Sequence, residues 1–221
     1  KREMQKKQLN YDVLLNKIGV SRGTCDLLCV YFDMLKFWNK KINLVSRKSI
    51  ETSWERHFLD SAQLWLHLPY KARKWLDFGS GAGFPALVLA VISRELKPEL
   101  KFILVEKNKK KAVFLLEIVK KIGLNVDIFP KNVELIKPQK ADVISSRAFG
   151  KLDHLLKIAY IHQNKCTISL FPKGVSFYEE LKLSKKNWDY ELEKIINIID
   201  QNSFILKIRN IACANKRLEK K

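Results

Sequence analysis

The sequence predicts an α/β protein in which a mostly parallel sheet follows an N-terminal helical segment. Three observations lead to this prediction. Apolar residues recur at helical spacing within residues 9–68, and Pro69 ends that segment. From residue 74 onward, short apolar runs alternate with helical stretches of about 10 to 15 residues, which is the pattern of βαβ units. A glycine-rich turn joins the first of these runs to the helix that follows it.

Each element follows from its own local pattern. The N-terminal segment is expected to be helical because Leu27, Tyr31 and Leu35 repeat every four residues. Strands are expected at about 74–78, 101–106, 125–129, 141–145 and 166–171, and helices at about 84–94, 108–122, 151–162 and 176–185. Two C-terminal runs, about 188–199 and 203–211, are close enough to be antiparallel neighbours. The predicted organisation is a helical cap (1–70), an α/β domain (71–213) and a basic tail (214–221), which together form one integrated domain.

Composition narrows the class of protein. The chain has 221 residues, and its 42 Lys+Arg against 23 Asp+Glu give a formal charge of +19. With 47% hydrophobic residues, disorder is excluded for most of the chain. The charge favours a polyanionic partner such as RNA, although a lineage-wide bias toward lysine would produce the same excess. An arginine near a site is more informative, because its planar fork is harder to replace than a point charge.

Several other classes are disfavoured. The cysteine spacings fit no zinc pattern, so no metal site is predicted. No apolar run approaches the roughly 18 residues of a membrane helix. The first residues lack the apolar core of a secretory signal. We therefore expect a cytoplasmic protein, with a monomer as the default state.

The turn at residues 77–85 is the most informative stretch. Gly79, Gly81 and Gly83 stand where a buried strand passes into a helix, and glycine there lets a ligand approach the backbone closely. The helix beyond offers free N–H groups. Phe84 occupies the place of the last glycine in a dinucleotide fingerprint, which disfavours an NAD enzyme. The G-x-G-x-G spacing instead resembles motif I of the S-adenosylmethionine-dependent methyltransferases.

Two acidic residues accompany this turn. Asp77 lies two residues before Gly79 and could meet the ammonium group of S-adenosylmethionine directly or through water. Glu106 ends the next predicted strand, 25 residues after Gly81. An acidic residue at that place accepts hydrogen bonds from ribose hydroxyls in nucleoside-binding α/β folds. The strand, turn and two carboxylates together predict a nucleoside-type cofactor.

The end of the fourth predicted strand suggests the methyl acceptor. Arg147 stands there and could bind a phosphate, the cofactor carboxylate or a guanine edge. Phe149 could stack on a base or pack under the loop. The chain has no Asp/Asn-Pro-Pro-aromatic loop, which argues against methylation of an exocyclic amine. No Pro-Cys pair follows this strand, so a covalent cysteine mechanism is disfavoured.

Several segments together resemble one family. They are Trp38 to Leu44, Arg56 to Ser61, Gly79 to Pro85, Ser146 to Phe149 and the pair Lys173-Gly174. The chain resembles the small-subunit ribosomal RNA guanine-N7 methyltransferases, also called the glucose-inhibited division protein B family, over about residues 9–212. The resemblance implies a class I S-adenosylmethionine-dependent methyltransferase fold, which is Rossmann-like with six parallel strands, one antiparallel strand and an N-terminal helical extension. It also implies methyl transfer to N7 of a guanine in a decoding-region hairpin of 16S rRNA.

The turn and the resemblance together define the candidate site. The cofactor-binding candidates are Asp77, Gly79, Ser80, Gly81, Gly83, Phe84, Glu106, Val133, Glu134 and Arg147. The RNA-binding candidates are Arg56, His57, Phe149 and Lys173. Arg147 is expected to position the reactants, and no general base is expected, because guanine N7 carries a lone pair and no proton. A methyltransferase with another RNA or non-RNA acceptor, or a non-catalytic RNA-binding assembly factor, remains an alternative.

Overall fold

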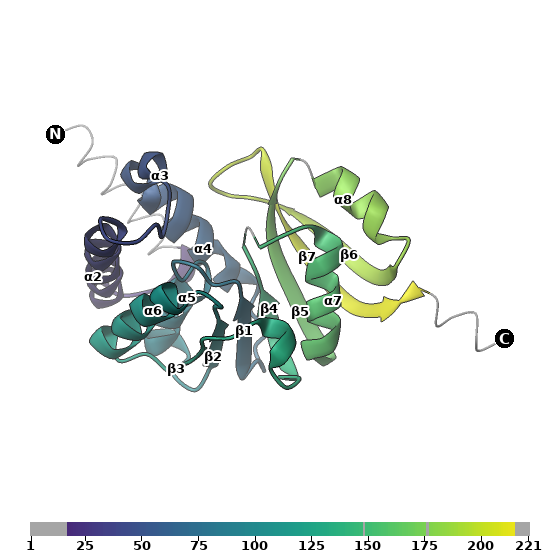
Figure 1. Cartoon of the computed structure of the whole chain (residues 1–221), viewed down its shortest axis with the longest axis horizontal. Coiled ribbons are helices and arrows are strands. Elements are labelled where there is room, and N and C mark those ends of the chain that lie inside the picture. The colour runs from purple at the N-terminus through teal and green to yellow at the C-terminus, as the bar shows by residue number, and fades with distance from the viewer. Residues whose placement is uncertain (1–16, 148, 176, 215–221) are drawn as a thin grey trace.

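A seven-stranded sheet forms the centre of the computed structural model, which describes residues 17–147, 149–175 and 177–214 (Figure 1). The strands are β1 Lys74–Phe78, β2 Lys101–Val105, β3 Val126–Phe129, β4 Ala141–Ser145, β5 Gln163–Gly174, β6 Trp188–Ile196 and β7 Ser203–Cys213. Their order across the sheet is β3-β2-β1-β4-β5-β7-β6. Strands β1 to β5 pair in parallel, and β7 runs antiparallel to both β5 and β6. The predicted sheet of six parallel strands and one antiparallel strand is confirmed.

Helices cover both faces of this sheet (Figure 1). One face packs against α5 (Ala86–Leu96) and α6 (Lys109–Ile122), on which α2 (Arg22–Asn39) packs in turn, and the other face against α7 (Leu152–His162) and α8 (Phe177–Ser184). The described residues also form short helices: α3 Arg47–Glu51, η1 Trp54–Leu59, α4 Asp60–Ala62, η2 Gln63–His67 and η3 Val133–Leu135. The predicted end of α6 is confirmed, because Gly123 adopts the left-handed conformation that closes a helix.

Strand β1 shows how the sequence pattern produces two covered faces. Trp75 belongs to the core that α2, α5 and α6 share, whereas Leu76 and Phe78 belong to the core under α7 and α8. Successive side chains of a strand point to opposite faces of the sheet. A strand with apolar residues at both odd and even positions is therefore buried on both faces. The sequence KWLDF therefore specifies a central strand, and Asp77 within it is fully buried.

The N-terminal helices pack directly onto the glycine-rich turn. Tyr31 of α2 stacks on Phe84 with ring centroids 5.6 Å apart and meets Phe58 of η1 edge-on at 5.0 Å. The Tyr31 hydroxyl also donates a hydrogen bond to the carbonyl of Ala82 in the turn. Because one hydrophobic cluster includes residues from both predicted domains, the cap and the α/β domain form one core. The predicted boundary near residue 70 stays a prediction.

Three sequence-based boundaries differ from the structure. The segment predicted as helical is interrupted after α2, because the Asn39 side chain accepts hydrogen bonds from the backbone N–H groups of Leu44 and Val45. Strand β5 is longer than predicted, since it begins at Gln163 and continues to Gly174. Strand β6 ends before Asn197, whose side chain accepts from the next backbone N–H groups and starts a turn. Residues 1–16 and 215–221 lie outside the described residues, and most of the predicted tail lies with them.

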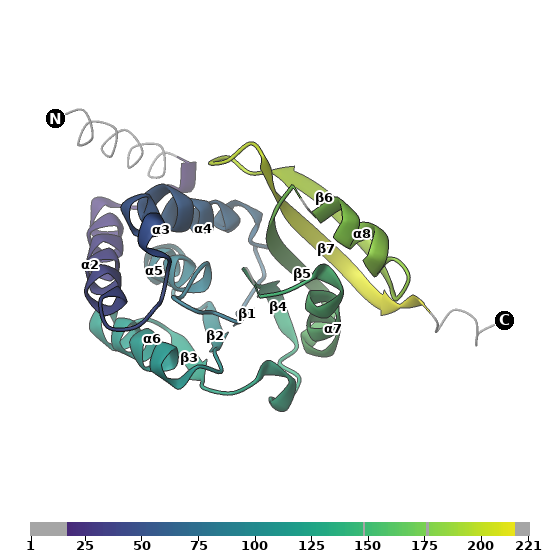
Figure 2. The same cartoon turned by 45° about the horizontal axis from the view of Figure 1, so that its top comes forward.

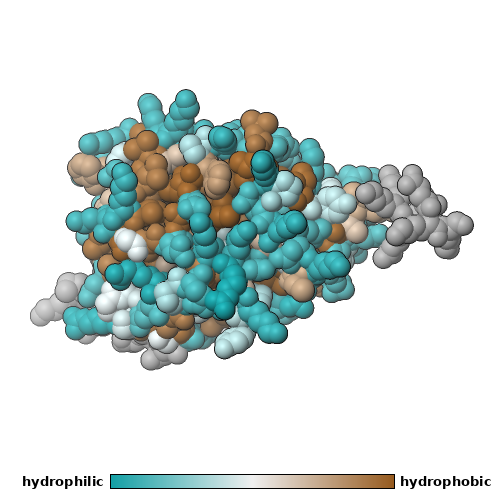
Figure 3. Space-filling view, turned by 90° about the horizontal axis from the view of Figure 1, so that it is seen from below, coloured by the Kyte–Doolittle hydropathy of each residue, from teal (hydrophilic) through white to brown (hydrophobic). Residues whose placement is uncertain are grey.

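The surface is uneven in polarity. Seen from the side that is lowest in Figure 1, hydrophobic side chains gather in one large area of this face, and mostly hydrophilic side chains surround it (Figure 3). Among the residues that the structure describes, no helix is long and apolar enough to cross a membrane.

Candidate functional site

The glycine-rich turn follows β1 at the carboxyl end of the parallel strands, which Figure 2 brings forward. Gly79, Gly81 and Gly83 have φ angles of +67°, +56° and +96°, a region that other L-residues rarely adopt. The backbone N–H groups of Gly79 and Ser80 donate to the carbonyl of Val105 at the end of β2. The turn is therefore fixed to the neighbouring strand, and its glycines are required by its backbone conformation.

Asp77 lies beneath this turn and is fully buried. Its Oδ1 accepts a hydrogen bond of 2.6 Å from the Ser145 hydroxyl, which itself accepts from the Trp75 indole N–H at 2.8 Å. Burial raises the pKa of Asp77 from 3.8 to about 7. Its Oδ2 is buried and has no hydrogen-bond partner among the described residues. A buried carboxylate oxygen of this kind suits a cationic donor, such as the ammonium group of S-adenosylmethionine.

Glu106 is held rigidly at the end of β2. One of its oxygens accepts from the backbone N–H of Gly81 and the other from that of Asn108, both at 2.8 Å. A carboxylate has about four acceptor positions, so each oxygen can still accept one more hydrogen bond. Two backbone N–H groups thus place and orient the carboxylate, as a pair of ribose hydroxyls would require.

A cavity of about 200 Å³ lies between the turn and the ends of β2 and β3. It is lined by Gly79, Gly81, Val105, Glu106, Lys107, Lys111, Lys131, Asn132, Val133 and Phe149. We call it the cofactor cavity. Five of these residues are candidates from the sequence, whereas the three lysines and Asn132 were not predicted. Glu134 was predicted beside Val133, but it is exposed and pairs with Lys157 of α7 at 3.2 Å.

Phe149 forms one wall of the cofactor cavity. Its ring packs edge-on against Phe78 at 5.4 Å and stacks on His154 at 5.6 Å. It also lies so close to Gly79 that a Cβ atom there would come within 2.0 Å of the ring. The structure therefore places Phe149 under the loop after β4, beside the cofactor cavity.

Arg147 joins three candidates that lie far apart in the sequence. Its Nη2 donates to the carbonyl of Arg56 at 2.7 Å and to His57 Nδ1 at 2.8 Å, and its Nη1 lies 3.5 Å from a carboxylate oxygen of Asp60. Arginine can only donate, so His57 Nδ1 accepts in this contact; the same Nδ1 also lies 3.1 Å from the carbonyl of Arg56, to which it donates in the other tautomer. Burial, and then the charge of Arg147, lower the pKa of His57 to about 4. His57 is therefore neutral near pH 7.

His57 also contacts the glycine-rich turn. Its ring stacks on Phe84 with centroids 4.9 Å apart. Arg147, His57 and Phe84 thus form a continuous path from the loop after β4 to the turn after β1. Both Arg147 and the carbonyl of Arg56 engage His57 Nδ1, and Nε2 is buried without a hydrogen-bond partner among the described residues.

A wide groove lies on the other side of Arg147. It has a volume of about 770 Å³ and is lined by Thr52, Glu55, Arg56, Asp60, Arg147, Pro172, Lys173, Gly174, Asn197, Ile199, Asp200 and Ser203. We call it the hairpin groove, because the turn between β6 and β7 forms one of its walls. Lys173 is anchored there, since its Nζ donates to Glu180 at 2.7 Å and to the carbonyl of Gly150 at 2.8 Å. The groove and four candidates meet at the carboxyl ends of β4 and β5: Arg56, His57, Arg147 and Lys173.

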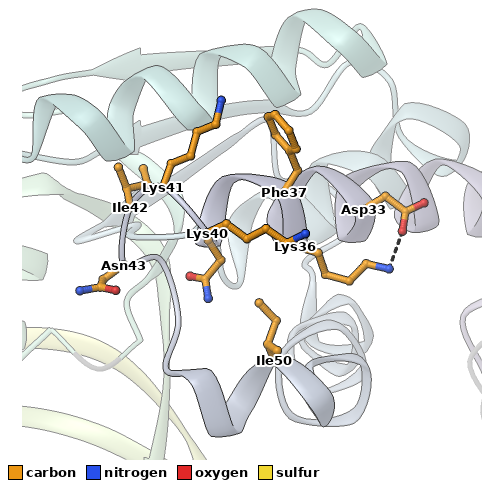
Figure 4. A pocket seen from close by; sticks show the side chains of 9 residues that line it. Asp33, Lys36, Phe37, Lys40, Lys41, Ile42, Asn43 and Ile50 are labelled. Atoms are coloured by element: carbon orange, nitrogen blue, oxygen red, sulfur yellow. Dashed lines mark ion pairs between the residues drawn. The ribbon is translucent and has the colours of Figure 1, made fainter.

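A third hollow, of about 860 Å³, lies at the C-terminal end of α2 (Figure 4). Lys36, Phe37, Lys40 and Lys41 contribute to it, and we call it the lysine hollow. The Phe37 ring is 56% exposed and carries the Nζ of Lys41 at 4.4 Å from its centroid. No group of three or more His, Cys, Asp or Glu residues that could hold a metal ion occurs in the described part of the chain.

A family model described as rRNA small subunit methyltransferase G matches residues 24–203. The chain belongs to this family. A ribosomal RNA small subunit methyltransferase G of Cereibacter sphaeroides is 39% identical over 199 residues, which cover 90% of this chain and 97% of the relative. Another, from a Jannaschia species, is 40% identical over 86% of this chain and 90% of its own length. The resemblance inferred from the sequence motifs is thereby confirmed.

Solved structures support the fold of this rRNA small subunit methyltransferase G family member. A crystal structure of an S-adenosylmethionine-dependent methyltransferase from Aquifex aeolicus superposes with a TM-score of 0.56 at 14% identity, covering 71% of this chain and 92% of that one. A fibrillarin/Nop5p complex gives 0.54 at 16% identity, over 71% and 82% of the two chains. The predicted class I methyltransferase fold is confirmed, and the enzyme depends on S-adenosylmethionine.

Proposed function

We propose that this enzyme transfers a methyl group from S-adenosylmethionine to N7 of one guanine in a decoding-region hairpin of small-subunit rRNA. The observation that carries the proposal is the built cofactor site in a member of an rRNA methyltransferase family. A fixed Glu106 carboxylate and a buried, unpartnered Asp77 oxygen flank an open glycine-rich turn. These are the acceptors that a nucleoside bearing an ammonium group needs.

The residues divide the work of holding the cofactor. Asp77 receives the ammonium group, Glu106 receives the ribose hydroxyls, and Val133 packs beside the adenine. Gly79 and Gly81 keep the backbone clear, while Ser80, Gly83 and Phe84 hold the shape of the turn. S-adenosylmethionine, when bound, supplies an electrophilic methyl group on a sulfonium centre. The cofactor cavity and the hairpin groove would then lie on either side of the loop after β4.

Methyl transfer to guanine N7 is compatible with the charged side chains around Arg147. Methylation of N7 removes no proton, so the reaction needs no general base and the neutral His57 need not act as one. Catalysis then depends on alignment at about 3–3.5 Å. Positive charge moves from sulfur to the purine during the transfer, and an uncompensated cation nearby would oppose it. The carboxylate of Asp60 beside Arg147 reduces that opposition.

RNA binding follows from the charge of the surface. We propose that Arg56, the lysine hollow and the lysines at the rim of the cofactor cavity contact phosphates of the rRNA or of the small ribosomal subunit. An aromatic ring among lysines, as at Phe37, suits an unpaired nucleotide. We propose that the enzyme acts on this substrate as a monomer in the cytoplasm. Sedimentation of the enzyme with and without rRNA tests the monomer.

The decisive experiment is transfer of a labelled methyl group to small-subunit rRNA that lacks the modification. The label is then mapped by strand cleavage specific for N7-methylguanine. Cleavage in the decoding-region hairpin is expected. Labelled RNA without that cleavage would contradict N7 as the acceptor atom. Absence of label in both naked rRNA and small subunits would favour another acceptor or a non-catalytic assembly factor.

A further inference from the structure

The hairpin groove carries both positive and negative side chains, which is not the lining of a surface that binds only the phosphate backbone. Arg56, Arg147 and Lys173 line it, but so do the carboxylates of Glu55, Asp60 and Asp200. In a chain with nearly twice as many basic as acidic residues, this balance sets the groove apart. Carboxylates repel a phosphodiester, whereas an uncharged base with both donors and acceptors fits such a lining. Its volume of about 770 Å³ lies within the range of ligand pockets.

The groove lies next to the cofactor cavity. Arg147 lines the groove and Phe149 lines the cavity, and two residues of chain span at most about 7 Å. A base held in the groove therefore reaches the neighbourhood of the cofactor without a large movement of the protein. A nucleotide can enter such a site only when it is taken out of its stack.

A buried amide network fixes the wall of the groove that comes from the β6–β7 hairpin. Gln63 and Asn197 are 4% and 2% exposed, and Gln63 Nε2 donates to Asn197 Oδ1 at 2.9 Å. Asn197 Nδ2 in turn donates to Asp60, which also faces Arg147. Gln63 Oε1 accepts from the backbone N–H of Ile198 at 3.0 Å. The hairpin turn is thus bound to the segment that positions Arg147.

The same network positions Asp200. Its backbone N–H donates to Asn197 Oδ1 at 3.0 Å, and its carbonyl accepts from the backbone N–H of Ser203 at 2.9 Å. Its Oδ1 accepts from the backbone N–H of Asn202 at 3.0 Å. No residue of the described ranges is hydrogen-bonded or ion-paired to Oδ2, and the side chain is exposed to the groove. Asp200 therefore presents a fixed carboxylate that retains acceptor capacity.

We propose that the hairpin groove receives the target nucleotide and that Asp200 selects guanine by accepting hydrogen bonds from its N1–H and 2-amino groups. This inference rests on the proposed function and names the specificity-determining residue of that site. Guanine presents two parallel donors on its Watson–Crick edge, which match the two oxygens of a carboxylate. Adenine presents an acceptor at N1, which a carboxylate repels. N7 lies on the opposite side of the purine and stays available for methylation.

The test compares two enzymes on two RNAs. Wild type and Asp200→Asn are assayed on small-subunit rRNA carrying either guanosine or inosine at the target position, since inosine lacks only the 2-amino group. We expect wild type to prefer guanosine in kcat/KM by about 10-fold or more, and Asp200→Asn to lose about 10- to 100-fold on guanosine. The variant should no longer prefer guanosine over inosine. Its affinity for S-adenosylmethionine should equal that of wild type.

Asp127→Asn is the matched control, because Asp127 is an exposed aspartate on β3, at the opposite edge of the sheet. It should retain the wild-type preference. An Asp200→Asn variant that keeps full activity and full discrimination would overturn the inference. Tighter RNA binding or faster methylation by Asp200→Asn would also overturn it, since removing this negative charge helps only if a phosphate lies where the guanine base is placed. If wild type leaves the guanosine rRNA unmethylated, the proposed function itself fails.

Discussion

Substitution of Gly81 separates cofactor binding from folding more cleanly than any other change in the turn. A Cβ atom at this position would have one neighbour within 4 Å, the carbonyl oxygen of Gly79 at 3.8 Å. An arginine side chain would therefore extend into the cofactor cavity without displacing the core. The Glu106 carboxylate, which accepts from the Gly81 N–H, would attract its guanidinium and hold it there.

The cost to the fold comes from the backbone alone. Gly81 has a φ of +56°, and a non-glycine residue in the left-handed region costs roughly 1–2 kcal/mol. For a chain of this size, each kcal/mol lowers Tm by about 2–4 °C, so Gly81→Arg should lower it by about 2–8 °C. The affinity for S-adenosylmethionine should fall on the order of 100-fold or more, which corresponds to about 2.7 kcal/mol.

Titration calorimetry with S-adenosylmethionine and a thermal melt measure the two quantities. Gly19→Arg is the matched control, since Gly19 is exposed, has a φ of +78° and would have no atom within 4 Å of an added Cβ. It should show a similar loss of Tm and wild-type affinity for the cofactor. Unchanged affinity in Gly81→Arg would refute the assignment of the cavity to S-adenosylmethionine.

Three further predictions concern charged groups. Arg147→Ala should reduce methyl transfer strongly and destabilise the fold by about 1–3 kcal/mol. It should also raise the pKa of His57 measured by NMR, because the charge of Arg147 lowers that pKa. An unchanged pKa would disprove the interaction between these side chains. The pKa of Asp77 is raised to about 7, so the stability linked to its protonation is complete below pH 4 and lost as the pH rises through 7. Asp77→Asn should therefore show a smaller loss of stability between pH 5 and 8 in denaturant titrations, and an equal loss would contradict the burial argument. RNA affinity should fall steeply as the salt concentration rises. Replacing the three lysines of the lysine hollow by glutamine should lower the slope of log affinity against log salt concentration by about 0.7 for each RNA phosphate that these lysines neutralise. An identical slope would exclude this surface from RNA binding.

The sequence predicts best what is local. Strand β1, the glycine-rich turn and the start of α5 are contiguous in the sequence, so residues 74–86 predict both the fold and the cofactor site. Glu106 follows from the same logic, because it ends the neighbouring strand. The meeting of Arg147 with His57 spans 90 residues and was expected only through the family resemblance.

Other parts of the site have no local signal. Tyr31 belongs to an apolar helical stripe, and nothing in that stripe indicates that its hydroxyl would bind the carbonyl of Ala82. Asn197 and Asp60 are 137 residues apart and of types common in any loop. Lys107, Lys111 and Lys131 are three of many lysines, and only the three-dimensional structure shows that they surround the cofactor cavity. Long-range polar interactions of this kind depend on topology, which a single sequence specifies only weakly.

The bond between Gln63 and Asn197 has a consequence for synthesis of the enzyme. The two residues are 134 positions apart, and the strand that completes this edge of the sheet, β7, is made last and inserts between β5 and β6. Chains emerge from the ribosome N-terminus first, and their early parts can fold before the rest exists. A nascent chain that stops before residue 197 can hold the glycine-rich turn, but it lacks a wall of the hairpin groove. The hairpin groove, and the nucleotide recognition that we propose for it, is therefore completed only after the parallel part of the sheet has been made.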